Sequence, residues 1–505
     1  MKRMDFSNAA TPGAAAQAFL ARGAQRHFIG GEWIDARAGG HFETRDPASG
    51  EVIGRLARGT AEDVDAAVAA ARTAFEDGRW SGLVPMERAK VLWNIAEKLE
   101  ANIDELAELE TLDQGKALYV GRWAEIPGAV NQFRYFSGLA TKIEGATIPT
   151  SINYQPEGKE VFAYTQHLPV GVVGAIVPWN SPLVLTAMKL APALAAGCTV
   201  VLKPAEDTSL TAVRLVELMM EAGLPEGVVN LVTGYGSEAG AALAAHPGVD
   251  KIAFTGSTAT GRAILDAAKG NLKRVTLELG GKSPVIVMDD ADLDAAIPGA
   301  ANAIYFNGGQ VCIAGSRLYA HRSVFDRVVE GVAEAAKGIT LGHGLDPATQ
   351  MGPLVSKRHA AKVADYVADG RKAGASVLVG GETTGPNESF VTPTILTGVS
   401  PDMRIVREEV FGPVVVATPF DDFDEVVAAA NDSDYGLAAG VWTESLSTAT
   451  RITRRLQAGT VWINSHAMYD PSLPIGGIKQ SGWGRDSGQV AIENYLNLQT
   501  VCAVV

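Results

Sequence analysis

The sequence predicts an α/β protein that contains two doubly wound parallel-sheet domains and a small β-hairpin standing apart from them. Short apolar runs alternate with helical segments from Val170 onward, and a second set of the same kind follows Cys312. The runs lack a period-2 alternation, as expected of strands that helices cover on both faces. The chain has 505 residues, which favours two large domains because a single hydrophobic core rarely grows to that size.

The N-terminal part contains short strands followed by long helices. Residues 28–56 hold glycine and Asp-Pro turns between short apolar stretches, a pattern typical of short strands. Helical periodicity begins in the segment 60–78, where Thr60 can act as the cap and acidic residues fill the first turn. The segment 85–118 continues as further amphipathic helices, which we interpret as scaffold.

The segment 147–168 differs from its surroundings. Its β-branched and aromatic residues alternate with polar ones around a Pro-Glu-Gly turn, which predicts a hairpin separate from the helices. The last residues of the chain, 494–505, read as a further edge strand.

Five apolar runs after Val170 predict the first parallel sheet. The predicted strands are 171–179, 198–204, 227–234, 251–257 and 274–281, and the helices between them are 181–197, 209–223, 237–246 and 258–270. In such a sheet the ligand lies beyond the carboxyl ends of the strands. Polar residues follow those ends, so a dinucleotide is expected there; they are Asn180, Lys203, Glu206, Ser257 and Glu278.

A second alternation of strands and helices follows Cys312. The predicted strands are 316–324, 375–381, 413–420 and 457–465, and the predicted helices are 325–339, 360–374 and 421–432. The segment 341–356 is a long loop of glycine, proline and polar residues, which we expect over the active site. A second Gly/Pro-rich loop, 466–485, follows the last strand.

Composition narrows the class of protein. The formal net charge of −14 argues against nucleic acid or an anionic membrane surface as the main partner. Three cysteines without a pairing pattern predict a reducing compartment. The N-terminus lacks the apolar core of a signal peptide, and the longest low-polarity stretch, 190–202, is too short to span a bilayer, so we expect a cytoplasmic enzyme. The histidines show no metal-ligand spacing, and no metal is predicted.

Cys312 is the candidate nucleophile. It lies in the glycine-rich stretch YFNGGQVCIAGSR, whose glycines let backbone amides approach a developing oxyanion. A thiol attacks only as the thiolate, so its surroundings are expected to help it ionise. A lone cysteine is more often a small buried hydrophobe. That interpretation suits Cys198 and Cys502, which lie in apolar runs, better than Cys312.

Six motifs in order resemble the aldehyde dehydrogenase superfamily. FNGGQVC resembles its nucleophile motif and LELGGKSP, which contains Glu278, its glutamate motif; the others are PWN at 178–180, KPAE at 203–206, FTGST at 254–258 and EEVFGP at 408–413. The resemblance extends from about Phe28 to the C-terminus. The segments 309–317, 346–356 and 461–486 further resemble the phenylacetaldehyde dehydrogenase branch.

The resemblance implies a role for each motif residue. Cys312 is expected to attack the aldehyde, Glu278 to activate water, and Asn180, with the backbone N–H of Cys312, to stabilise the oxyanion. Glu206 would repel a 2′-phosphate, which favours NAD, while use of NADP stays open as the less favoured alternative. The implied cofactor contacts are Val177, Pro178, Trp179, Lys203, Glu206, Phe254, Gly256, Ser257, Leu279, Glu409 and Phe411.

The substrate pocket departs from the family pattern at two positions. Ser181 follows PWN where many relatives carry Phe, and Ile475 replaces the Phe common in LPFGG. The pocket is predicted to be formed by Ser181, Leu185, Met188, Tyr469 and Ile475. Its apolar wall suits aryl, arylalkyl or branched and terpenoid aldehydes without a charged tail. The roles of Lys189 and Asp486 are left open.

The resemblance also implies a division of the chain. Residues 1–146 and 169–280 are expected to form a Rossmann-like NAD-binding domain and 281–488 the catalytic thiol domain. Residues 147–168 and 489–505 are expected to assemble a homodimer or homotetramer. Two alternative functions remain: a CoA-acylating semialdehyde dehydrogenase, against which the intact Glu278 argues, and a catalytically silent, crystallin-like member.

Overall fold

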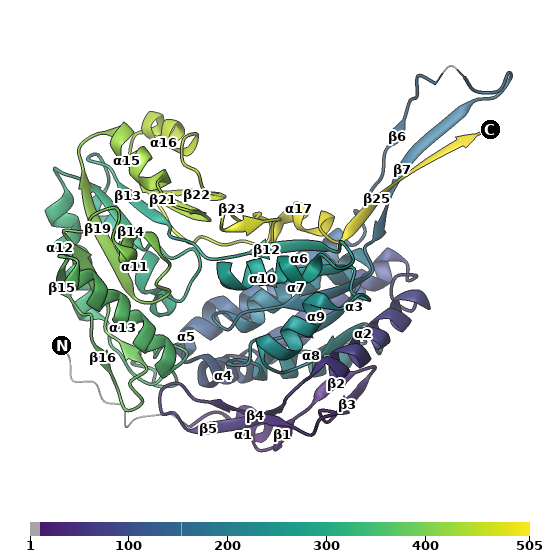
Figure 1. The fold of residues 1–505 in the computed structure, drawn as a ribbon, viewed down its shortest axis with the longest axis horizontal. Helices are drawn as coiled ribbons and strands as arrows, with labels where there is room; N and C mark the ends of the chain where they lie inside the picture. The colour runs from purple at the N-terminus through teal and green to yellow at the C-terminus, as the bar shows by residue number, and fades with distance from the viewer. Residues whose placement is uncertain (1–10, 153) are drawn as a thin grey trace.

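The computed structural model of the protein describes residues 11–152 and 154–505. Two α/β units lie side by side, and a narrow β-arm projects from one of them (Figure 1). Residues 1–10 of the predicted NAD-binding domain and residue 153 of the predicted hairpin lie outside the described residues.

The first unit contains an eight-stranded sheet in the order β24-β12-β11-β8-β9-β10-β2-β3. The five central strands are parallel, and β24, β2 and β3 add antiparallel edges. The strands are β2 (His27–Ile29), β3 (Glu32–Ile34), β8 (Val172–Ile176), β9 (Thr199–Lys203), β10 (Val229–Leu231), β11 (Lys251–Thr255), β12 (Arg274–Glu278) and β24 (Gly482–Trp483). Every residue of β8, β9 and β11 is buried, as the apolar runs without alternation predicted.

Helices surround this sheet. They are α2 (Ala61–Glu76), α3 (Pro85–Ala101), α4 (Ile103–Gln114), α6 (Ile126–Leu139), α7 (Pro182–Ala196), α8 (Leu210–Glu221), α9 (Ala241–Ala245) and α10 (Thr258–Ala268), with a π-helical turn, η1 (Gly121–Glu125), before α6. Thr60 and Asp63 form a reciprocal capping box at the start of α2, where the sequence predicted a cap. A three-stranded sheet of β1 (Ala24–Gln25), β4 (His41–Arg45) and β5 (Val52–Ala57) completes this part.

The strand order reverses next to β8. From β8 the chain moves outward to β9 and β10, then returns to the other side of β8 with β11 and β12. The loops that follow β8 and β11 therefore diverge at a topological switch point, the place where open α/β sheets bind ligands.

The second unit contains a seven-stranded sheet in the order β15-β18-β19-β14-β13-β21-β22, parallel except for β15. Its strands are β13 (Pro284–Val287), β14 (Arg317–His321), β15 (Ser376–Val379), β18 (Thr394–Thr397), β19 (Val414–Phe420), β21 (Ala438–Trp442) and β22 (Thr460–Ile463). Its main helices are α11 (Leu293–Tyr305), α12 (Phe325–Gly338), α13 (Lys357–Lys372), α15 (Phe423–Asn431) and α16 (Leu446–Thr453). The strands β13, β18 and β21 and the helices α11 and α16 were not predicted from the sequence.

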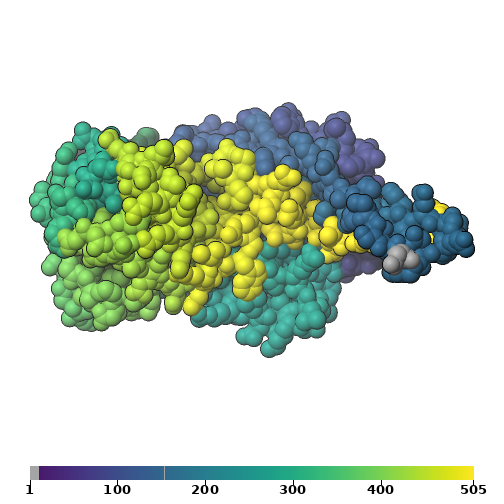
Figure 2. Space-filling view, turned by 90° about the horizontal axis from the view of Figure 1, so that it is seen from above, coloured from purple at the N-terminus to yellow at the C-terminus, as the bar shows by residue number. Residues whose placement is uncertain are grey.

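The arm consists of three antiparallel strands, β6 (Thr147–Ile148), β7 (Val161–Pro169) and β25 (Leu496–Val504). The C-terminal strand β25 pairs with β7 over nine residues, whereas β6 pairs with β7 over only two. The arm extends from one end of the molecule, and the C-terminal part of the chain lies along the middle of the face shown in Figure 2. The short helix α17 (Gly488–Glu493) precedes β25.

Among the described residues no helix combines the length and the apolarity needed to cross a bilayer.

The strand β24 belongs to the first sheet although it lies within the predicted range 281–488. The exact domain boundaries therefore stay predictions.

Candidate active site

Two glycines bring the end of β12 against two other loops. A Cβ atom at Gly281 would lie 2.5 Å from the carbonyl oxygen of Cys312, and one at Gly280 would collide with the carboxylate of Glu409. The backbone N–H of Gly281 donates a hydrogen bond of 2.9 Å to that carboxylate. The GG of LELGGK is therefore required for close packing around the thiol.

The stretch before Cys312 is a tight turn. Residues Asn307, Gly308 and Gly309 have φ values of 49°, 62° and 69°, in the left-handed region that glycine adopts most easily. A Cβ atom at Gly309 would collide with the carbonyl of Gly412, in the EEVFGP segment. The turn thus presents Cys312 close to the loop that carries Glu409.

A cavity of about 360 Å³ lies beside the thiol. Ten of the predicted site residues line it: Pro178, Trp179, Asn180, Leu185, Gly256, Ser257, Leu279, Cys312, Glu409 and Phe411. Its volume is within the usual range for ligand pockets. The predicted nucleophile, the oxyanion donor and several predicted cofactor contacts therefore share one cavity at the switch point.

Asn180 is held against the nucleophile loop. Its side-chain amide donates to the carbonyl of Gln310 at 3.0 Å. Its own backbone carbonyl accepts from the Lys116 ammonium and from the Asn307 amide, both at 3.1 Å. These three bonds fix Asn180 next to Cys312, so a small rotation of its amide would direct a donor toward a substrate oxygen.

The Cys312 thiol is protonated at neutral pH in the protein alone. Burial, followed by the negative charges of Glu409 and Glu278, raises its pKa to about 12. The expectation that the surroundings help the thiol ionise is therefore wrong for the protein alone, because burial and, after it, the nearby carboxylates outweigh the backbone N–H groups. A positive charge in the cavity would act in the opposite direction.

Glu278 ends β12 and is almost fully buried. Burial, and then the carboxylate of Asp486, raise its pKa well above the usual value, while Lys189 and Arg485 act to lower it. Its Oε1 atom has no hydrogen-bond partner. Burial without a hydrogen-bond partner and a raised pKa are the environment expected of a carboxyl that exchanges a proton during catalysis.

Lys189 and Asp486 form a buried ion pair. The ammonium lies 2.5 Å from the carboxylate, and both side chains are inaccessible to solvent apart from 7% of Asp486. The pair lies near Glu278, as its influence on the pKa of that carboxyl shows. The ion pair therefore keeps one positive and one negative charge at fixed positions near Glu278.

The expected adenine-ribose contacts are arranged as a pair. The Lys203 ammonium lies 3.0 Å from the Glu206 carboxylate. Burial acts to raise the pKa of Glu206, but Lys203 and backbone N–H groups keep it below its usual value. Glu206 is thus a carboxylate available to accept hydrogen bonds. Ser257 caps the N-terminus of α10, where helix amides suit a pyrophosphate.

Nine predicted residues do not line the cavity itself: Val177, Ser181, Met188, Lys203, Glu206, Phe254, Glu278, Tyr469 and Ile475. Conversely, eight residues that line the cavity were not predicted from the sequence, namely Asp207, Thr255, Gly280, Val355, Ser356, Arg358, His359 and Lys362. Val355 and Ser356 belong to the loop that was expected over the site. The sequence did not indicate that charged residues of α13 contact the cavity, because their pattern is that of an ordinary solvent-exposed helix face.

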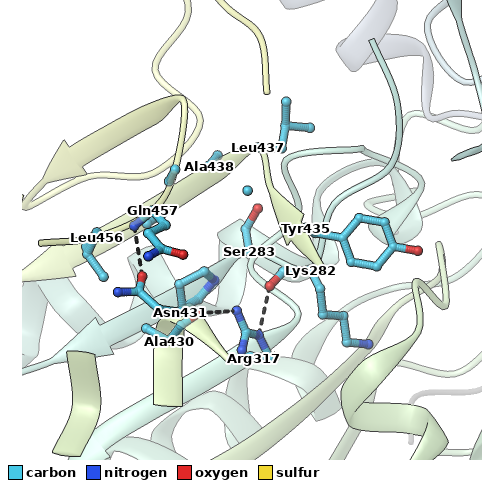
Figure 3. A pocket seen from close by; sticks show the side chains of 14 residues that line it. Lys282, Ser283, Arg317, Ala430, Asn431, Tyr435, Leu437, Ala438, Leu456 and Gln457 are labelled. Atoms are coloured by element: carbon cyan, nitrogen blue, oxygen red, sulfur yellow. Dashed lines mark hydrogen bonds between the residues drawn. The ribbon is translucent and has the colours of Figure 1, made fainter. Parts of the chain in front are cut away.

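A second hollow lies behind the LELGGK segment (Figure 3). Its volume is only about 10 Å³, enough for a single water molecule at most. The Arg317 guanidinium is directed at the backbone carbonyl of Lys282 and donates to it at 2.8 Å. This hollow is a packing feature that supports the loop, and the larger cavity is the candidate active site.

Comparisons with known proteins identify the family. The model described as the aldehyde dehydrogenase family matches residues 33–501. The chain belongs to the aldehyde dehydrogenase family. The resemblance of the sequence motifs, the predicted fold class and the expectation of an oxidoreductase are thereby confirmed.

Several relatives of this aldehyde dehydrogenase are similar over nearly its full length. A phenylacetaldehyde dehydrogenase from Pseudomonas fluorescens is 49% identical over 475 residues, 94% of each chain. A mitochondrial benzaldehyde dehydrogenase from Antirrhinum majus is 46% identical over 474 residues, 94% of this chain and 88% of the relative. A Bacillus cereus aldehyde dehydrogenase, solved as an NAD+ complex, is 46% identical with a TM-score of 0.95, covering 98% of this chain and 99% of that one.

Proposed function

We propose that this aldehyde dehydrogenase oxidises hydrophobic aldehydes, either aryl, arylalkyl or branched, to carboxylic acids with NAD as the hydride acceptor. The single observation that carries the proposal is one cavity that contains Cys312, Asn180, Glu409 and Phe411 at the switch point of the first sheet. The 49% identity to a phenylacetaldehyde dehydrogenase supports the substrate class.

The residues support a four-step route. The thiol proton passes to solvent as the Cys312 sulfur bonds to the aldehyde carbon and the π bond of the carbonyl opens onto oxygen. The oxyanion of this thiohemiacetal accepts hydrogen bonds from Asn180 and the Cys312 backbone N–H. Loss of hydride from that carbon leaves a thioester. Glu278 then takes a proton from water as the water attacks the thioester, and the C–S bond breaks to release the acid and the thiol.

The chemistry of the cavity lining and of the neighbouring Glu206 fits NAD. In the lining, Ser257 offers a helix N-terminus for the pyrophosphate and Glu409 offers a carboxylate. Glu206, outside the lining, offers a carboxylate for a ribose hydroxyl. NAD would supply the hydride acceptor and, in its oxidised form, a positive ring. A positive charge beside Cys312 would offset the carboxylates that raise the pKa of the thiol.

The choice of NAD over NADP depends on Glu206. The variant Glu206→Gln removes the negative charge that would repel a 2′-phosphate, so its kcat/KM ratio of NAD to NADP is expected to fall about 10- to 100-fold. The measurement is NADH and NADPH formation from phenylacetaldehyde at matched cofactor concentrations. Glu62→Gln, an exposed change on α2 away from the cavity, is the control. An unchanged ratio in Glu206→Gln would contradict the assignment.

We further propose that the arm assembles a homodimer or homotetramer. Leu498 on the edge strand β25 is 61% exposed and Phe162 on the middle strand β7 is 48% exposed, and exposed apolar side chains on an unpaired edge or a sheet face favour association. We expect Leu498→Glu to shift the mass in light scattering toward the monomer. Leu446→Glu, at an 82% exposed site on α16, is the matched control. The proposal fails if both variants keep the wild-type mass or if the wild type is monomeric.

The compartment is also a proposal. All three cysteines are unpaired, one of them exposed on the arm. Free thiols of this kind support a reducing location such as the cytoplasm.

A further inference from the structure

Lys116 follows α4, and its side chain is completely inaccessible to solvent. Its ammonium lies 2.6 Å from a carboxylate oxygen of Glu110 and 3.1 Å from one of Glu125, and these two side chains are also buried. Burial acts to lower the pKa of Lys116, but the two carboxylates outweigh burial and raise that pKa above its usual value. The side chain is therefore an ammonium, with three N–H donors that need partners inside the protein.

The same ammonium contacts the backbone of Asn180. It donates a hydrogen bond of 3.1 Å to the carbonyl oxygen of Asn180, which also accepts from the Asn307 amide. The side-chain amide of Asn180 has two N–H groups, and one of them donates to the carbonyl of Gln310 at 3.0 Å. Because Asn180 lines the cavity, its second N–H remains for a substrate oxygen. The direction of that N–H depends on where Lys116 and Asn307 hold the backbone.

The backbone of Lys116 is itself held by the long loop that precedes α13 in the second unit. A Cβ atom at Gly344 would lie 2.3 Å from the carbonyl oxygen of Lys116, and one at Gly352 would lie 1.8 Å from that of Gly115. Only glycine permits so close an approach of two backbones. The loop therefore fixes the base from which the Lys116 side chain extends.

The loop also contacts the nucleophile turn, so the contacts form a closed ring. The backbone N–H of Val355, in the loop, donates at 2.9 Å to the side-chain oxygen of Gln310. Gln310 accepts from Asn180, Asn180 accepts from Lys116, and Lys116 packs on the loop. Lys116 is the charged member of this ring, and hydrogen bonds from a charged donor are stronger than neutral ones. Its loss is therefore expected to loosen Asn180 more than the loss of a neutral contact.

We propose that Lys116 is a positioning residue for the oxyanion contact: its ammonium holds the Asn180 backbone where the free amide N–H meets the oxygen of the thiohemiacetal. The inference rests on the proposed function, because that oxygen becomes negative only when Cys312 attacks an aldehyde. Lys116 does not line the cavity. Its effect therefore falls on the rate of the first chemical steps, which depends on the geometry of the donor, and not on the binding of NAD.

The test is a double-mutant cycle between Lys116 and Asn180, in which the rate constant of NADH formation in the first turnover is measured by rapid mixing with saturating NAD and phenylacetaldehyde. Lys116→Met keeps an unbranched side chain but removes the ammonium. Its rate constant is expected to fall about 10- to 100-fold, because the donor is misplaced, while KM for NAD stays within about twofold of the wild-type value. Asn180→Ala removes the donor and is expected to lower the rate constant about 10²- to 10³-fold.

The combination of the two changes decides between positioning and a general structural role. When the Asn180 amide is absent, Lys116 has no donor to position. Adding Lys116→Met to Asn180→Ala should therefore lower the rate constant by less than about threefold, so that the two effects are far from additive.

A matched control and a second cycle keep the test decisive. Lys273 is another buried lysine, and its ammonium donates to the carbonyls of Ala244 and His246, outside the cavity lining. Lys273→Met should keep the wild-type first-turnover rate. Because a buried carboxylate that loses its counter-charge lowers stability, the cycle is repeated with Lys116→Met and Glu110→Gln together, against Glu110→Gln alone. Melting temperatures identify any variant that is not folded.

Three results would overturn the inference: a wild-type first-turnover rate in Lys116→Met, an equal loss from Lys116→Met with and without the Asn180 amide, and a loss confined to KM for NAD. Each of these leaves aldehyde oxidation by Cys312 intact. A wild-type rate in Asn180→Ala would instead contradict the oxyanion contact in the proposed function, and the inference would fall with it.

Discussion

The variant Cys312→Ala will form no measurable NADH from any aldehyde that the wild type oxidises. Without the sulfur there is no thiohemiacetal, and hydride has no activated carbon to leave. Loss of the nucleophile in a covalent enzyme removes most of the rate enhancement, so the expected fall in kcat is at least about 10⁴-fold. The absorbance of NADH measures it directly, in both the first turnover and the steady state.

The other cysteines provide controls for this result. Cys198 is fully buried and hydrogen-bonded to the carbonyl of Tyr495, and Cys502 is exposed on the arm. Cys502→Ala should retain the wild-type rate, because it lies far from the cavity. The melting temperature of Cys312→Ala should match that of the wild type, which excludes unfolding as the cause. Steady turnover by Cys312→Ala would rule out the nucleophile assignment.

The central strands of the first sheet could be predicted because the pattern that indicates each strand lies within the strand and its neighbouring residues. Strands such as β8 and β9 are continuous apolar runs bounded by glycine or proline, and the sequence alone shows this. The strand β21 has the sequence AAGVW, in which alanine and glycine have low strand propensity. It is a strand because β13 and β22 pair with it on both sides. Such pairing cannot be seen in a window of five residues.

The arm illustrates the same limit. Alternation predicted strands in 147–168 and near the C-terminus, yet the main partner of β7 is β25, more than 300 residues away in the chain. The pairing of the hairpin with itself covers two residues only. A hairpin turn is a local signal, whereas the nine-residue pairing depends on how the rest of the chain folds.

The contacts that hold the active-site residues in place were the features hardest to predict from the sequence. Lys116 and Asn307 both donate to the carbonyl of Asn180, and neither carries a local sign of that contact. The pKa of Cys312 was misjudged for the same reason. Its neighbours in sequence are uncharged, whereas its pKa is raised by burial in the folded chain and then by Glu409 and Glu278, which come from distant segments. Family motifs identified these residues, but their electrostatic effect required the folded structure.

The variant Glu278→Gln is expected to separate the two halves of the reaction. The amide has the size of the carboxyl but cannot take a proton from water, so hydrolysis of the thioester should slow by about 10²- to 10⁴-fold. Attack by Cys312 and loss of hydride do not need this base. Rapid mixing should therefore show a burst of about one NADH per active site, followed by a slow steady rate.

The pH dependence distinguishes a base from a merely structural carboxyl. Burial and Asp486 raise the pKa of Glu278 well above its usual value, so as pH falls the carboxyl gains a proton at a higher pH than an ordinary glutamate does. The wild-type steady rate should decline on that acidic side, because only the deprotonated form accepts a proton from water. In Glu278→Gln this decline should disappear, since no titrating group remains at the position. A normal steady rate in Glu278→Gln, or an acidic decline that persists unchanged, would show that another group activates the water and that the buried carboxyl serves packing alone.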